Sequence, residues 1–274
     1  MNGDESIQAS ISRRALCMAG LGMLSGAGQS VTAELAGTGT LRAAINLGNP
    51  ILAKRAASGE LQGVSVDLAK EAARRLGLPI ELVAFEAAGK VVEAVKAKQV
   101  DLAFVAIDPV RGADMDYTAP YVIIEGAYLV RADSPLQRNE DVDRAGTRVV
   151  VGRGSAYDLF LTRSLQSATL VRAPTSPAVT DQFLAEKLEV AAGVKQQLEA
   201  DMRRLAGTGN APALRLLPGR FMAIEQAMAV PKGRLAAQAW LSTFIEEMKA
   251  SGFVAEALRR HGIEGASVAP PKAS

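Results

Sequence analysis

The sequence predicts an α/β protein made of two lobes, each with a mostly parallel sheet flanked by helices. Strand and helix signals alternate along the chain, which is the pattern of βαβ units. The run VDLAFVAI at 100–107 is apolar without alternation, so it predicts a strand buried on both faces, as in a parallel sheet covered by helices. The alternation starts again after the polar, turn-rich segment ADSPLQRNED at 132–141, and this restart predicts the second lobe.

The helix predicted at 67–76 is the clearest element of the first half. Leu68, Ala72 and Leu76 share one face of a helix, and Gly77 supplies the glycine that commonly follows a helix end. The other elements predicted here are strands at 41–47, 80–85 and 100–107, a helix at 90–98 and an extended segment at 122–130.

The second half ends with a long helix predicted at 235–251. Trp240, Phe244 and Met248 recur every four residues in it, which indicates a face packed in the core. The tail at 266–274 is rich in small residues and proline, and we expect it to be disordered. The other elements predicted here are strands at 148–151, 170–172, 188–192 and 227–230 and helices at 155–166, 179–187 and 196–205.

The first 33 residues predict an export signal. Arg13 and Arg14 precede an apolar stretch rich in glycine and alanine, which is the twin-arginine pattern. The apolar stretch at 15–28 is too short to span a bilayer. Small residues up to Ala33 form a signal-peptidase site, so we expect cleavage there and a periplasmic location. The processed chain then has no disulfide, because Cys17 is the only cysteine.

Composition excludes several classes of function. One His and one Cys cannot make a zinc site of the usual kind, which needs about four such ligands. His261 stands just before a glycine, where a cation at the last turn of a helix is the expected role. A net charge of +2 and 4% aromatic residues offer neither an electrostatic nor a stacking surface for nucleic acid. We therefore expect no metal, no cofactor and no nucleic-acid partner.

Five segments follow one another in the order of a known family pattern. They are GVSVDLAKEAARRLG (63–77), KAKQVDLAFVAIDPVRGADMDYTAPY (96–121), TRVVVGRGSAYDLFL (147–161), AMAVPKG (227–233) and ASGFVAEALRRHG (250–262). Together they resemble the bacterial extracellular solute-binding proteins of family 3, the amino-acid receptors of ABC importers. Each segment alone is weakly specific, and the ordered set over about 39–262 carries the resemblance.

The resemblance implies the two-lobed type II periplasmic binding protein fold, which closes on its ligand like a hinge. On this pattern the first lobe is 34–128 with 222–265, and the second is 133–217. Two extended crossovers, at 129–132 and 218–221, join the lobes. In open α/β sheets the ligand lies beyond the carboxyl ends of the strands, so loops at those ends are expected to face the cleft.

Arg111 is the residue that the resemblance implies for the ligand's carboxylate. A guanidinium binds both carboxylate oxygens at once, which a lysine cannot do. The alternative is a surface arginine paired with Asp114 or Asp116. Gly154 and Ser155 begin a predicted helix, where the serine is an N-cap and the free backbone N–H groups also favour an anion.

Other positions depart from the family pattern. Val194 stands where the acid that receives the ligand's ammonium is expected, and Lys195 beside it would repel an ammonium. Asn49 and Glu86 stand near the places of the aromatic residues that sandwich the ligand, so amino-acid specificity does not carry over. The residues predicted to contact ligand are Arg111, Ser155, Asn46, Glu86, Ala106, Asp108, Gly154 and Val194, and none is assigned as catalytic.

Three functions are compatible with the resemblance. The first is the monomeric periplasmic component of an ABC importer, which binds a small carboxylate-bearing solute and delivers it to a membrane permease. The second is an enzyme similar to cyclohexadienyl dehydratases, which need an acid in the cleft. Glu86 or Asp108 could serve there if burial raised its pKa, and both could also be solvated loop acids. The third is a sensory component that docks on a receptor without transport.

Overall fold

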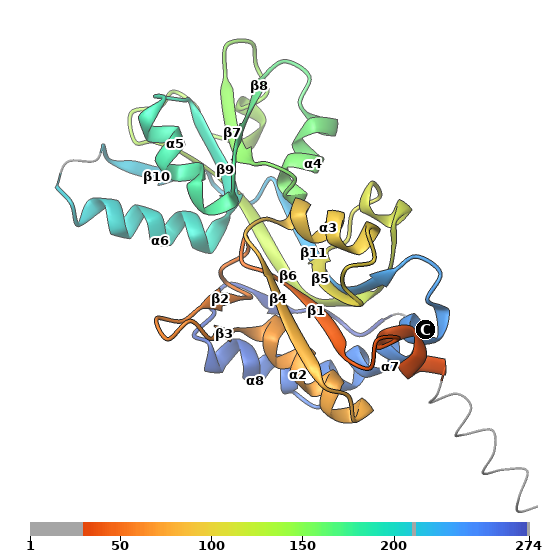
Figure 1. The fold of residues 1–274 in the computed structure, drawn as a ribbon. Helices are drawn as coiled ribbons and strands as arrows, with labels where there is room; N and C mark the ends of the chain where they lie inside the picture. Colours follow the sequence, from red (N-terminus) through yellow and green to blue (C-terminus); the bar gives the residue numbers. More distant parts are fainter. Residues whose placement is uncertain (1–29, 210–211, 273–274) are drawn as a thin grey trace, which may run out of the picture.

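The computed structural model describes residues 30–209 and 212–272, which form two lobes, one above the other in Figure 1. Most of the predicted export signal, including Arg13 and Arg14, lies outside these residues. Ten of the described strands form one sheet that continues through both lobes, in the order β4-β1-β5-β11-β6-β9-β7-β8, with β10 and β12 also paired to β6. In the described part of the chain no helix is both long and apolar enough to cross a membrane.

The first lobe is a mostly parallel sheet with helices on both faces. Strand β1 lies between β4 and β5 and is parallel to both, and β11 returns antiparallel to β5. Helices α2, α7 and α8 cover one face of this sheet, and α3 covers the other. The elements are β1 (Leu41–Asn46), β2 (Lys54–Arg55), β3 (Leu61–Gln62), α2 (Val64–Leu76), β4 (Ile80–Phe85), α3 (Ala88–Lys96), β5 (Leu102–Ala106), η1 (Arg111–Ala113), β11 (Met222–Pro231), α7 (Leu235–Ala250), α8 (Phe253–Arg260) and β12 (Ser267–Val268).

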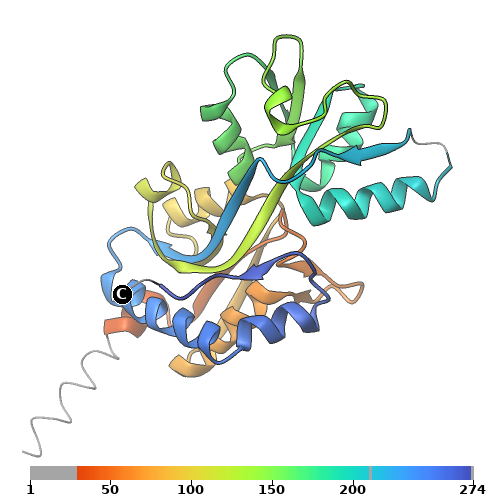
Figure 2. The same ribbon diagram turned by 180° about the vertical axis from the view of Figure 1, so that it is seen from behind.

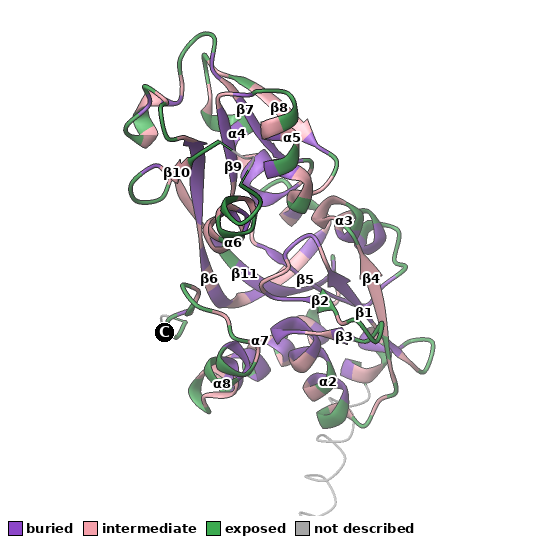
Figure 3. Ribbon diagram, turned by 90° about the vertical axis from the view of Figure 1, so that its left-hand side faces the viewer, coloured by how far each residue is buried: buried purple, intermediate pink, exposed green. Residues whose placement is uncertain are grey.

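The second lobe repeats this design on a smaller scale. Strands β8, β7 and β9 are parallel, and α4 packs on one face while α5 and α6 pack on the other. Figure 3 shows the strands of both lobes largely buried beneath helices whose outer surfaces are exposed. The elements are η2 (Asn139–Asp141), β7 (Arg148–Gly152), α4 (Ala156–Ser164), β8 (Thr169–Ala173), η3 (Ser176–Ala178), α5 (Val179–Ala185), β9 (Val190–Val194), α6 (Lys195–Ala206) and β10 (Leu214–Leu216).

The lobes are joined by β6 (Met115–Arg131), a strand of 17 residues that runs through both. It pairs with β11 as far as Gly126 and with β9 from Gly126 onwards. The change of partner therefore falls before the predicted crossover at 129–132, whose residues pair with β10 in the second lobe. The returning segment at 218–221 runs beside β6, where the backbone N–H of Phe221 donates to the carbonyl of Gly126 at 3.0 Å.

Glycine is needed at the point where the lobes join. A Cβ on Gly126 would lie 2.5 Å from Cε1 of Tyr157 and 3.0 Å from the ring of Phe221. The Phe221 ring stacks on Tyr128, with ring centroids 4.3 Å apart, and meets Tyr157 edge-on. This aromatic cluster packs directly onto the backbone of β6, which leaves no space for a side chain at Gly126.

The carboxyl-terminal segment corrects the expectation of a disordered tail at 266–274, as far as its residues are described. Strand β12 pairs antiparallel with β6 at Val122 and Ile123. The backbone N–H of Ala269 then donates to the carbonyl of Tyr121 at 3.0 Å, and Ala269 is buried. Figure 2 shows this segment running beside β6. Backbone pairing, which composition does not reveal, orders it.

The amino-terminal segment also packs on the first lobe. Residues 30–35 are helical, and Leu35 is fully buried in the core. The side chain of Glu34 accepts a hydrogen bond from the backbone N–H of Ala237 at 2.8 Å, and its carbonyl accepts one from Arg234. Since Arg234 makes no side-chain cap at the start of α7, Glu34 provides the cap from far away in the sequence.

His261 lies at the end of a helix, as predicted. It is the C-cap of α8, and its Nε2 lies 2.7 Å from the carboxylate of Asp67 on α2. This contact joins two helices of the first lobe, away from the cavity described below. Phe244 and Met248 are buried as expected, whereas Trp240 is only partly buried and stacks on Phe244.

Candidate ligand-binding site

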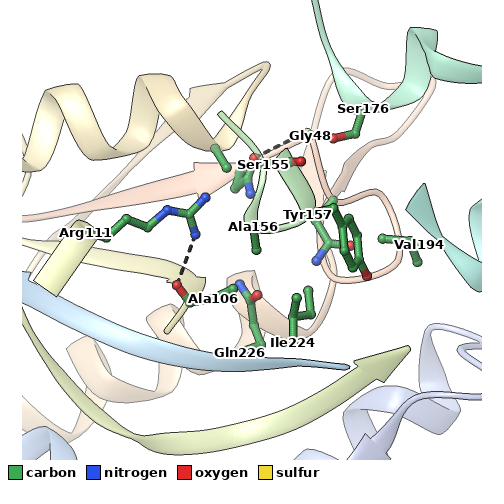
Figure 4. A pocket seen from close by; sticks show the side chains of 13 residues that line it. Gly48, Ala106, Arg111, Ser155, Ala156, Tyr157, Ser176, Val194, Ile224 and Gln226 are labelled. Atoms are coloured by element: carbon green, nitrogen blue, oxygen red, sulfur yellow. Dashed lines mark hydrogen bonds between the residues drawn. The ribbon is translucent and has the colours of Figure 1, made fainter. Parts of the chain in front are cut away.

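A cavity lies between the lobes, where strands of both lobes end (Figure 4). It is narrow, since the centre of a water molecule can reach only about 30 Å³ of it, room for two or three waters at about 10–15 Å³ each. The first lobe contributes the loop after β1, the start of α3, the end of β5, Arg111 and part of β11. The second contributes the start of α4, the turn after β8 and the end of β9. The lining residues are Asn46, Gly48, Asn49, Ala88, Ala106, Arg111, Ser155, Ala156, Tyr157, Ser176, Val194, Ile224 and Gln226.

Arg111 reaches the cavity from the turn that follows β5, and its side chain is 3% exposed. Nη1 donates to the carbonyl of Ala106 at 3.0 Å and Nη2 to the carbonyl of Gly154 at 2.9 Å. In the described part of the chain, Nε has no hydrogen-bond partner and no carboxylate bonds this guanidinium.

Burial lowers the pKa of Arg111, and the nearby Tyr117 and Asp108 offset only part of that effect. The guanidinium nevertheless stays charged, because arginine is not deprotonated in proteins. A buried charge is costly unless an opposite charge accompanies it. The surroundings of Arg111 therefore favour the binding of an anion.

The start of α4 faces Arg111 across the cavity. Ser155 is its N-cap, and the Ser155 hydroxyl accepts the backbone N–H of Asp158 at 3.1 Å. The carboxylate of Asp158 in turn accepts the N–H of Gly154 at 2.8 Å. The backbone N–H groups of Ala156 and Tyr157 meet no acceptor within the described residues, and both residues line the cavity. Free N–H groups at the positive end of a helix dipole bind anions readily.

Three contacts hold the lobes together beside the cavity. Arg111 of the first lobe bonds the carbonyl of Gly154 in the second. Gly154 also packs against Gly89 at the start of α3, where a Cβ on Gly154 would lie only 3.2 Å from the Gly89 Cα. Finally, Asp108 of the first lobe forms an ion pair of 2.9 Å with Arg163 on α4. The lobes are therefore closed over the cavity.

The structure gathers most of the predicted contact residues at this cavity. Arg111, Ser155, Asn46, Ala106 and Val194 line it. Gly154 lies beside it and touches Arg111 through its carbonyl. Their role as ligand contacts stays a prediction.

The two acids on that list are placed differently. Glu86 is exposed and does not line the cavity. Asp108 is buried but does not line the cavity either, since its oxygens bond the backbone N–H of Val110 and the side chain of Arg163. Neither carboxylate is therefore positioned as a group of the cavity.

Sequence reasoning left several lining residues out of the contact list. Gln226 on β11 is buried, and Asn49 is buried with its Oδ1 unpartnered in the described part of the chain. Tyr157 and Ser176 complete the wall on the second lobe. A signal for Gln226 was present, because it is an amide among apolar residues of a buried strand, and buried amides need partners.

These features define a class of protein. Two α/β lobes joined by paired strands, with a buried cation and a helix amino terminus between them, have the fold of the periplasmic binding proteins. The family model of the bacterial extracellular solute-binding proteins, family 3, matches residues 41–263. The chain belongs to this family.

Solved structures show the same fold at low sequence identity. A solute receptor for L-cysteine from Neisseria gonorrhoeae has a TM-score of 0.72 and 23% identity, covering 84% of this chain and 93% of its own. An ancestral amino-acid-binding protein described as a precursor of cyclohexadienyl dehydratase has a TM-score of 0.68 and 19% identity, and the match covers 83% of this chain and 97% of the ancestral protein. A histidine kinase sensor domain has a TM-score of 0.70 and 21% identity, and the match covers 85% of this chain and 98% of the sensor domain. A search of curated proteins finds no significant match.

Proposed function

We propose that the protein is the periplasmic substrate-binding component of an ABC importer and that it binds a small carboxylate-bearing solute between its lobes. One observation carries the proposal: the buried Arg111 guanidinium has no acidic hydrogen-bond partner among the described residues and faces the free N–H groups of α4. Two independent sources of positive potential thus converge on one small cavity. A carboxylate has the charge and the paired oxygens to satisfy both.

The closed lobes support a binding cycle in which the cleft opens, takes up the solute and closes again. Arg111 belongs to the first lobe and the start of α4 to the second, so a carboxylate between them bridges the lobes. Bound solute then favours the closed form, because only that form offers both sets of donors. A membrane permease that recognises the closed form would receive loaded protein.

The dehydratase alternative draws support from the ancestral binding protein of similar fold, which is described as a precursor of such an enzyme. Its chemistry needs an acid in the cleft. Among the described residues no Asp or Glu lines the cavity, and this disfavours the enzyme. The sensory alternative draws support from the kinase sensor domain. A sensory protein would use the same ligand cavity, so the two functions differ in the partner that the loaded protein docks on, a receptor or a permease.

The test is the affinity of purified variants for a panel of small carboxylates, measured by calorimetry. We expect Arg111→Ala to weaken binding at least about a hundredfold, because the buried carboxylate of the ligand is then left without its charged partner. Arg111→Lys should restore little, since an ammonium cannot make the paired bonds. Arg153→Ala is the control, because Arg153 is exposed just before α4 and bonds no side chain in the described residues. Unchanged affinity in Arg111→Ala would overturn the carboxylate proposal.

For export we propose the twin-arginine route on the sequence Arg13-Arg14. Replacing both with lysine should leave uncleaved precursor in the cytoplasm, detected by cell fractionation. Amino-terminal sequencing of the exported wild type should begin at Glu34 or within a few residues of it. Normal export of the Lys-Lys variant would refute this route while leaving other export routes open.

A further inference from the structure

We propose that the cavity selects small 2-hydroxy acids, that is, carboxylates with a neighbouring hydroxyl group and no ammonium group. This inference rests on the proposed function, since it takes the carboxylate end of the ligand to lie at Arg111 and the start of α4. It concerns the other end of the ligand, and it separates this chain from receptors that hold a free α-amino acid.

The cavity has no negative charge for an ammonium group. Among the described residues Arg111 is the only charged residue in its lining. Val194 ends β9 and lines the cavity, and its side chain offers only methyl groups. An ammonium held in so narrow a site would lose much of its hydration without gaining a counter-charge, and that cost is large.

The acids that lie near the cavity are already engaged. Asp158, behind the start of α4, accepts hydrogen bonds from Gly154, Arg172 and Thr162. Asp108 is paired with Arg163, as described above. To release either carboxylate for a ligand would break an existing ion pair, so neither is free to receive an ammonium.

Glu125, on β6 near the end of β9, is engaged in the same way. Lys195 and Arg220 lie 3.3 and 3.2 Å from its two oxygens. Lys195, the cation beside Val194, is thus paired with Glu125 outside the cavity lining. Because Glu125 already has two positive partners, it is not free to pair with a ligand ammonium.

The lining offers instead an uncharged hydrogen-bond acceptor. Asn49 is 7% exposed, and its Oδ1 is buried with no hydrogen-bond partner in the described residues. A buried carbonyl oxygen of this kind gains a bond from a hydroxyl donor and repels a second carboxylate. Gln226, also buried, adds a second amide to the lining of the cavity (Figure 4). A neutral hydroxyl can donate to the Asn49 oxygen without the counter-charge that a buried ammonium needs and that the lining lacks.

The matched probes are lactate, alanine and propanoate, which differ only in bearing a hydroxyl, an ammonium or a hydrogen beside the carboxylate. Calorimetry on the wild type should give the tightest binding for lactate or for a longer 2-hydroxy acid. We expect alanine to bind at least about a hundredfold more weakly than lactate, because its ammonium, although it can donate to Asn49, has no counter-charge in the lining. Propanoate should bind about tenfold more weakly than lactate, because it leaves Asn49 unbonded.

Two variants test the cause, and the first has a matched control. Val194→Asp should raise the affinity for alanine relative to lactate at least tenfold, whereas Val194→Asn, of similar size but neutral, should not. Asn49→Ala should remove the advantage of lactate over propanoate and leave the affinity for propanoate nearly unchanged. Thermal melting of each variant shows that it is folded.

The outcomes separate this inference from the proposed function. If alanine and its larger homologues bind the wild type as tightly as the hydroxy acids do, and Arg111→Ala abolishes that binding, the carboxylate receptor stands and the hydroxy-acid selectivity is wrong. If no member of a panel of hydroxy, amino and unsubstituted acids binds the wild type, both are wrong. Preference for lactate that Asn49→Ala leaves intact would overturn the role of Asn49.

Discussion

Asp101 is a buried carboxylate that joins three parts of the first lobe. It lies just before β5 and accepts hydrogen bonds from Arg42 on β1 at 2.8 Å and from Arg234 before α7 at 2.8 Å. Burial raises the pKa of Asp101, but the bonds from Arg42 and Arg234 together outweigh it, so the pKa is lowered overall. The ionised form therefore stabilises the fold.

We expect Asp101→Asn to lower the free energy of unfolding at pH 7 by about 3 kcal/mol, because two arginines lose their partner. The lowered folded-state pKa lies below the unfolded value of about 3.9. The contribution is thus fully present above about pH 4 and is lost as pH falls through the folded-state pKa. The difference in unfolding free energy between the wild type and the variant, measured with urea, should therefore become smaller at low pH.

The control for this prediction is Asp133→Asn, since Asp133 is exposed and has no ion pair among the described residues. That change should alter stability by no more than about 0.5 kcal/mol. A difference between wild type and Asp101→Asn that stays constant from pH 7 to pH 3 would contradict the linkage.

At the residue scale, the site could be predicted in part. Arg111 and Ser155 stand in motifs that follow strand ends, and chemistry and position both indicated them. Asn49 and Gln226 reach the cavity because the loop after β1 folds inward and β11 returns through the sheet, which no local pattern reveals. Asp108 was predicted as a ligand contact, whereas it is paired with Arg163. The sequence gives no sign of this pair, because the two residues are far apart along the chain.

At the element scale, the start of α7 depends on a residue outside the helix. Glu34→Ala should cost about 1 kcal/mol of stability, because the backbone N–H of Ala237 loses its acceptor. Glu34→Gln is the matched control, since its amide oxygen can still accept that bond. Thermal or urea unfolding measures both variants. Equal stability of the alanine and glutamine variants would show that the cap contributes nothing.

Most elements were predicted because local signals mark their ends. Gly77 has a left-handed backbone and ends α2 where the sequence indicated. Strand β6, by contrast, begins at Met115, well before the predicted segment 122–130. Its first half is more polar and contains Pro120, and a proline usually indicates the end of a strand. Long-range pairing with β11 overrides that signal. The pairing with β11 shifts register on both sides of Ala227, the residue opposite Pro120, which has no N–H to donate. Nearby, the Thr118 hydroxyl accepts a hydrogen bond from the backbone N–H of Met228.

At the scale of the whole molecule, the ion pair between Asp108 and Arg163 holds the lobes closed. Arg163→Ala leaves a buried carboxylate with only the backbone N–H of Val110, so the closed form loses stability. A ligand that binds the closed form then shows a lower apparent affinity, by about tenfold, because that form is less populated. Small-angle scattering without ligand should show a larger particle than the wild type.

The control is again Arg153→Ala, an exposed arginine of the same lobe with no side-chain partner in the described residues. It should leave both affinity and scattering as they are in the wild type. If Arg163→Ala behaves in the same way as this control, the ion pair does not govern closure.

The paired strands at the junction of the lobes have a consequence for hydrogen exchange. The backbone hydrogen bonds between β6 and the returning strand continue as far as Gly126, which lies opposite Met222 and accepts the N–H of Phe221. Strand β9 pairs with the other edge of β6. A two-stranded ribbon twists readily, so the lobes can part by twisting it without breaking these bonds. Amide protons at the junction should therefore exchange with deuterium as slowly in the open protein as in the closed one. Fast exchange should be confined to the faces that line the cleft.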